Sequence, residues 1–141
     1  MADRGAGAGA LLLLVATAAC APTAAEVTRQ NQRVATDAQK VDRALAGLVP
    51  DAPTTCLSGI DRRDARSRAI GGTLLYTVSR SRVYRNDMNG TCDLSRDPIL
   101  VTATPSTSLC RGDIVQLIDR ASRFPVGSCA YGDFVPYRRA R

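Results

Sequence analysis

Residues 73–85, TLLYTVSRSRVYR, contain the pattern that decides the fold of this chain. Leu74, Tyr76 and Val78 follow the two-residue period of a β-strand, which places them on one face. Three residues, too few for anything but a turn, separate this run from a returning strand at 82–85. The stretch therefore predicts an antiparallel hairpin.

Short β-like segments continue on both sides of this hairpin. A weak first strand is expected at 57–61, and an arginine-rich loop or strand edge at 62–69. Further strands are expected at 98–104 (PILVTAT), 113–119 (DIVQLID) and 130–137, with a loop at 124–128. Short strands at close spacing, with no long helix between them, predict a mainly β fold. We expect a small antiparallel β-barrel or sandwich over residues 56–137.

A helical pattern precedes this domain at residues 26–49. Its apolar residues recur at helix spacing: Val27, Val34, Ala38, Val41, Leu45 and Leu48. Pro50 and Pro53 end the pattern and mark a linker at 50–55. The sequence therefore predicts an N-terminal amphipathic helix.

This helix has two interpretations. It can oligomerise as a short coiled coil through 26–48, with Asn31 setting the register. Alternatively, it is a single amphipathic segment, partly frayed or folded against its own domain. The apolar stripe is narrow and consists of small residues, so we favour the single segment.

The domain contains four of the five cysteines of the chain: Cys56, Cys92, Cys110 and Cys129. An even number predicts two disulfides if the domain reaches an oxidising compartment, and the absence of His and of CxxC pairs argues against zinc. Three pairings are open, and the sequence alone does not choose between them. We favour Cys92–Cys110 with Cys56–Cys129, because the first two flank a single strand and the others precede the first and last strands.

The fifth cysteine ends the apolar run 11–20, LLLLVATAAC. A run of this length is too short to span a bilayer but fits the core of a signal peptide at 1–19. Residues 17–20, TAAC, resemble the lipobox of bacterial lipoproteins, which implies cleavage before Cys20 and acylation with chains such as palmitate. Residues 20–25 would then be a tether, and Ala21 would favour the outer membrane. The alternative is an ordinary signal peptide, with Cys20 lost and the domain secreted.

The chain has a net charge of +6, and all its basic side chains except Lys40 are arginines. An excess of arginine is typical of a GC-rich genome, but it also favours binding to anionic envelope groups. The candidate anionic-surface patch consists of Arg62, Arg63, Arg66, Arg68, Arg80, Arg82 and Arg85. Nucleic acid is not expected as a partner of an exported protein. The basic tail at 138–141 is expected to be frayed.

The sequence predicts no catalytic residue, metal ligand or cofactor site. It has no His, its domain cysteines are expected to be paired, and its aspartates fall mostly in turns. The calcium-like segment 86–90 lacks the ligand spacing of such loops, and Arg111-Gly112-Asp113 is expected to lead into a strand. We therefore expect a binding or structural module of the periplasmic envelope. The alternative is a soluble periplasmic protein that binds anionic envelope groups or inhibits a hydrolase.

Four motifs occur in a familiar order: VYRND, NGTCDL, SLCRGDIVQLID and GSCAYGDFVPY. Over residues 56–137 the chain resembles a family of small, uncharacterised proteobacterial proteins with four spaced cysteines. The resemblance implies a secreted or lipid-anchored location and disulfides, and it implies no activity. The arginine-rich segment at 62–68 departs from the acidic turn expected there.

Overall fold

The structure is a computed structural model that describes residues 21–90 and 92–140. The chain divides between Gln32 and Arg33 into two compact units, and the second unit contains all the described strands. The predicted signal peptide and Cys20 lie outside the described residues.

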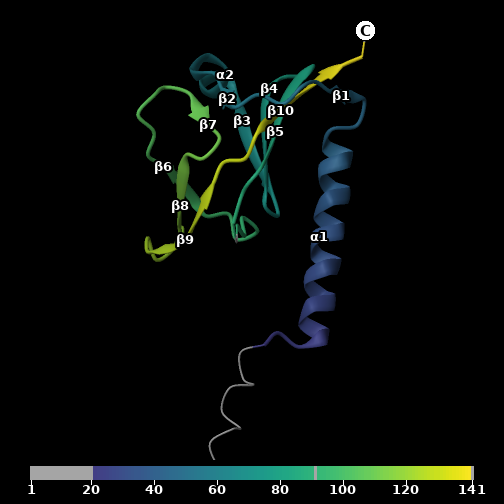
Figure 1. The fold of residues 1–141 in the computed structure, drawn as a ribbon, viewed down its shortest axis with the longest axis vertical. Helices are drawn as coiled ribbons and strands as arrows, with labels where there is room; N and C mark the ends of the chain where they lie inside the picture. The colour runs from purple at the N-terminus through teal and green to yellow at the C-terminus, as the bar shows by residue number, and fades with distance from the viewer. Residues whose placement is uncertain (1–20, 91, 141) are drawn as a thin grey trace, which may run out of the picture. The chain divides into compact units, whose positions relative to one another are not determined.

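The largest sheet has five antiparallel strands in the order β1-β10-β5-β4-β3 (Figure 1). Its strands are β1 (Leu48–Pro50), β3 (Arg66–Ile70), β4 (Thr73–Ser79), β5 (Arg82–Asp87) and β10 (Phe134–Arg139). The predicted hairpin is confirmed as β4 and β5, with Tyr76 opposite Tyr84 and Thr77 opposite Val83.

Two smaller antiparallel sheets complete the domain. One has the order β6-β8-β9, and the other pairs β2 with β7. The strands are β2 (Cys56–Leu57), β6 (Ile99–Thr102), β7 (Leu109–Cys110), β8 (Ile114–Ile118) and β9 (Pro125–Ala130). The predicted mainly β class is thus confirmed, and the described strands do not close into a barrel.

The five-stranded sheet packs against apolar side chains on both of its faces. Leu74 and Tyr76 point into the main core, together with the fully buried Leu57, Val115 and Phe134. The opposite face carries Ile70, Leu75 and Val83, which pack against Val41 and Leu45. This two-sided burial explains the consecutive leucines of β4, because adjacent residues of a strand point to opposite faces.

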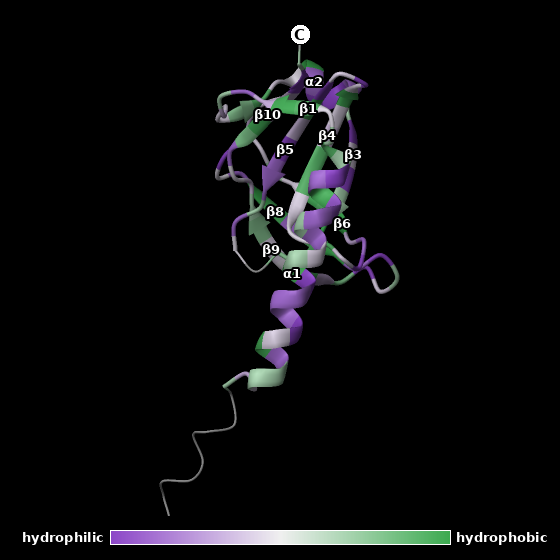
Figure 2. Ribbon diagram, turned by 90° about the vertical axis from the view of Figure 1, so that its right-hand side faces the viewer, coloured by the Kyte–Doolittle hydropathy of each residue, from purple (hydrophilic) through white to green (hydrophobic). Residues whose placement is uncertain are grey.

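Helix α1 (Ala24–Ala44) confirms the predicted N-terminal helix and is hydrophilic over most of its length (Figure 2). A capping box begins it: the Glu26 N–H donates to Thr23 Oγ1 at 3.3 Å, and the Thr23 N–H donates to the Glu26 carboxylate at 2.7 Å. The bond from the Thr23 backbone lowers the pKa of Glu26.

The predicted end of this helix, at residue 49, is wrong. The helix ends at Ala44, and Gly47 adopts a left-handed conformation with a φ of 78° that reverses the chain. Leu48 is then opposite Arg139, so β1 occupies the end of the predicted helix and the first linker residue, Pro50. The tail prediction is also wrong for Arg138 and Arg139, because both belong to β10.

Two further local predictions are wrong. The expected strand at 57–61 is β2 followed by helix α2 (Gly59–Asp64), because Ser58 caps this helix by accepting the Asp61 N–H at 3.1 Å. The expected loop at 124–128 belongs largely to strand β9. Pro125 begins β9 at the sheet edge, where its missing N–H is tolerated, and the pairing with β8 shifts at Leu117.

The two predicted disulfides are present, but the favoured pairing is wrong. The bonds are Cys56–Cys110 and Cys92–Cys129. Cys56 and Cys110 are opposite one another in the β2–β7 pair, with Cα atoms 4.0 Å apart. Cys129 points into the core from β9. There it is bonded to Cys92, which follows β5 in the chain. Pairing therefore follows from the register of remote strands, which proximity along the sequence does not reveal.

Peptide mapping without reduction should recover Cys56 linked to Cys110 and Cys92 linked to Cys129. Replacing Cys92 and Cys129 together by Ser should lower the free energy of unfolding by roughly 2–4 kcal/mol, because one bridge is lost. The matched variant, Cys92→Ser with Cys110→Ser, removes one cysteine from each bridge and so breaks both. Its free energy of unfolding, measured by chemical denaturation, should fall further. The reverse order of the two variants would contradict the pairing.

Candidate functional site

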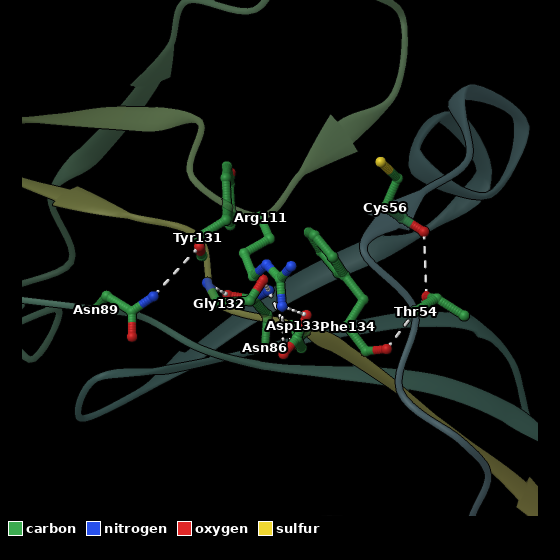
Figure 3. Close-up of polar contacts among 9 residues, drawn as sticks. All are labelled: Thr54, Cys56, Asn86, Asn89, Arg111, Tyr131, Gly132, Asp133 and Phe134. Carbon is green, nitrogen blue, oxygen red and sulfur yellow. Dashed lines mark hydrogen bonds and ion pairs between the residues drawn. The ribbon is translucent and has the colours of Figure 1, made fainter.

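The motifs of the sequence converge around the side chain of Asn86, at the end of β5 (Figure 3). Its amide donates to the carbonyl oxygens of Gly132 at 2.8 Å and Asp133 at 3.2 Å. Its own oxygen accepts the Gly132 N–H at 3.2 Å. Its exposure is 0%, and apart from the tyrosines it is the one buried polar side chain among residues 21–90 and 92–140. A buried amide with these bonds fixes the segment before β10 to the sheet.

Gly132 is required at this position because of the space around it. A Cβ atom there would overlap the backbone carbonyl of Asp87. Two residues further on, Phe134 exchanges backbone hydrogen bonds of 2.8 and 2.9 Å with Thr54. The motif YGDF therefore packs the chain against two neighbouring segments at once.

The triplet Arg111-Gly112-Asp113 forms a turn beside this cluster. The Arg111 guanidinium donates to the Asp133 carboxylate at 3.0 Å (Figure 3), and Gly112 has a φ of 90°. Asp113 accepts the Cys110 N–H at 2.9 Å and precedes β8. These contacts give the triplet a structural role, as a turn that leads into a strand.

The seven candidate arginines do not form one patch. Arg66, Arg68 and Ile70 alternate along β3, so they share the face of the sheet that packs against Val41. Arg85 is on the same face, because both it and Arg68 are opposite Leu75. Arg82 is on the other face of the sheet, in step with Tyr84 and Asn86.

Arg82 belongs to a separate polar cluster with helix α2. Its guanidinium lies 2.6 Å from Asp61, which also accepts the Tyr84 hydroxyl at 2.9 Å. Burial and then the bond to Asp61 raise the pKa of Tyr84. The cluster fastens α2 to the sheet. Because Arg82 is paired with Asp61, its charge is already neutralised.

The remaining arginines differ in their partners. Arg85 pairs with Asp87 at 3.0 Å, and Arg62 donates to the carbonyl oxygen of Thr107 at 3.3 Å. The other four make no side-chain hydrogen bond or ion pair with any residue that the structure describes: Arg63, Arg66, Arg68 and Arg80. These four are exposed and remain available to an anionic group.

A hollow of about 380 Å³ lies between β3 and β6. Its apolar lining comes from both strands and from neighbouring segments: Ala69, Leu74, Leu94, Pro98, Ile99 and Leu100. Its polar lining consists of Ser67, Asp97 and Arg120. The last two pair at 3.2 Å, so the rim near β6 is electrically balanced.

A smaller hollow of about 220 Å³ lies beside β8 and β9, and Asp93, Arg96 and Asp119 contribute to it. Its carboxylates are occupied locally. Bonds from Ser95 lower the pKa of Asp93, and bonds from Ser122 lower that of Asp119. Both carboxylates therefore serve as turn acceptors.

The outer face of the β6-β8-β9 sheet is partly apolar. Val101 is 48% exposed and Ile114 57%, whereas Val115 and Leu117 face the core. Phe124, which directly precedes β9 in the chain, is 72% exposed. Exposed apolar surface of this kind is typical of interaction sites.

Within the described residues no group of three or more metal-binding side chains comes together. No described helix combines the length and the apolar character needed to cross a membrane. No model of a known protein family, no curated protein and no solved structure matches the chain.

Sequence reasoning missed both Asn86 and the hollow between β3 and β6. Asn86 carried a signal, because it follows Tyr84 at the two-residue period of an inward-facing strand position. The hollow left none, since it joins strands far apart in the chain.

Replacing Asn86 by Ala should lower the free energy of unfolding by about 2–4 kcal/mol, because the Gly132 N–H and carbonyl lose their partner in the core. The matched variant is Asn89→Ala, whose exposed side chain makes one hydrogen bond of 3.5 Å. It should change stability by about 0.5 kcal/mol or less. Equal losses in urea denaturation would contradict the role of Asn86.

Proposed function

We propose that this chain is a lipid-anchored protein of the bacterial envelope, exported and acylated at Cys20. Its β-domain acts as a binding or structural module, with no catalytic chemistry of its own. The observation that carries this proposal is the pair of disulfides, Cys56–Cys110 and Cys92–Cys129. Such bonds persist in oxidising compartments such as the periplasm.

The contacts of the polar residues support a module rather than an enzyme. The motif side chains Asn86 and Asp113 bond to the backbone, and Arg111 pairs with Asp133. Asp61 is held by Arg82 and Tyr84. General acid–base work needs a group free to exchange a proton with a substrate, and these groups are engaged in holding the fold.

The expected outcome for the anchor can be measured in a Gram-negative host that expresses the full chain. Intact-mass analysis of the membrane fraction should find a chain that begins at Cys20, carries acyl groups and has no free thiol. Cys20→Ser should abolish acylation and move the protein out of the membrane fraction, because its lipid is lost.

As a control, Cys56→Ser with Cys110→Ser should leave acylation unchanged. An unprocessed chain in the cytosol with four titratable domain thiols would overturn the proposal.

A second candidate function is the binding of anionic envelope groups by a soluble periplasmic form. The four arginines without described partners favour it: Arg63, Arg66, Arg68 and Arg80. Because these side chains are exposed, their attraction for anions should weaken as salt increases.

Co-sedimentation with phosphatidylglycerol vesicles tests this second function. Changing the four arginines to Gln should reduce binding, and raised salt should have the same effect, since both weaken the electrostatic attraction. The control variant Arg138→Gln, together with Arg111→Gln, removes charges already paired with Asp51 and Asp133. Absent or salt-independent binding would exclude this function.

A further inference from the structure

We infer that the free edge of β3, with the hollow beside it, binds an extended acidic segment of a partner protein by strand addition. This inference rests on the proposed function as a binding module and names its partner by chemistry. The partner strand would pair with β3 and place alternate side chains over the hollow.

The two strands beside the hollow each have one unpaired edge. β3 ends the five-stranded sheet and pairs with β4 alone, and β6 ends its sheet and pairs with β8 alone. Outside these pairings, neither strand makes a backbone hydrogen bond to the described residues. A row of free N–H and C=O groups is a template for another strand.

The hollow provides space for the side chains of an added strand. Its volume of about 380 Å³ falls within the ~300–1,000 Å³ of ligand sites. Ser67 and Ala69 border it from β3, and Leu100 borders it from β6. Every second side chain of an added strand would point the same way as Ser67 and Ala69, toward a lining that includes the apolar residues Leu94, Pro98 and Leu100.

The other side chains of the added strand would meet positive charge. Residues directly opposite one another in a sheet share a face, so these side chains would point the same way as Arg66 and Arg68. Both arginines are exposed and lack an ion-pair partner in the described part of the chain. Carboxylates at these positions would pair with them, so the preferred segment alternates acidic and apolar residues.

The same charges argue against a second copy of this chain as the occupant. Two β3 strands brought edge to edge would place Arg66 and Arg68 of one copy beside those of the other, and like charges across a strand pair are destabilising. The charges on β3 therefore disfavour pairing with a second copy and favour an acidic partner.

The test uses the full chain with both disulfides formed and a fluorescent decapeptide that alternates glutamate and valine. Fluorescence anisotropy should show saturable binding, and amide hydrogen exchange should slow at β3. A peptide of the same composition with the glutamates and valines in two blocks should bind roughly tenfold more weakly, because its side chains cannot separate onto two faces.

Two variants of the chain locate the site. Changing Arg66 and Arg68 together to Gln should weaken binding roughly tenfold through the loss of two ion pairs. Ala69→Leu should also weaken it by narrowing the hollow. The matched control, Arg123→Gln with Arg139→Gln, removes the same charge from exposed residues outside β3 and should leave affinity within about twofold.

Equal binding of both peptides, equal losses in the test and control variants, or protection confined to another strand would overturn strand addition. Concentration-dependent dimerisation that protects β3 without peptide would also overturn it, as would binding of phosphatidylglycerol vesicles with no binding of peptide. The assay does not involve Cys20. Failure here with acylation intact leaves the proposed function standing, and binding without acylation removes only the anchor.

Discussion

The burial of one amide side chain ties β5 to the segment that leads into β10. Asn86 leaves water completely, and its hydrogen bonds go to the backbone of Gly132 and Asp133. A buried amide without partners is costly, so the chain entering β10 has little freedom in position. Phe134 follows at once and is the largest fully buried side chain of the described core. The hydrogen bonds of Asn86 thus help to position Phe134 in the core of a domain that has few aromatic residues.

The hairpin of β4 and β5 and the β class could be predicted, because a strand shows its period locally. The helix was predictable for the same reason, but its end was not. The apolar repeat continues to Leu48. However, the chain turns at the left-handed Gly47, and Leu48 then pairs with Arg139 as part of a strand. Local periodicity therefore predicts a helix that is too long, because it does not show where strand pairing with a remote segment begins.

The candidate site was less predictable, since its parts come from segments far apart in sequence. The arginines of 62–85 looked like one group, but strand parity separates Arg82 from Arg85, and Asp61 neutralises the former. The disulfide pairing failed for a related reason. Cys56 and Cys110 are neighbours only because β2 and β7 pair, and neither two-residue strand is distinctive in sequence.

The two disulfides overlap along the chain, since residues 92–110 lie inside both of the loops that they close. A peptide bond broken between 57 and 91 and a second one broken between 111 and 128 would still leave one covalent molecule. The middle fragment would hold Cys92 and Cys110, and each of these is tied to a different outer fragment. The nested alternative would release that fragment after the same two cuts. The crossed linkage thus keeps all three fragments in one covalent molecule after cuts that would free the middle fragment from a nested linkage.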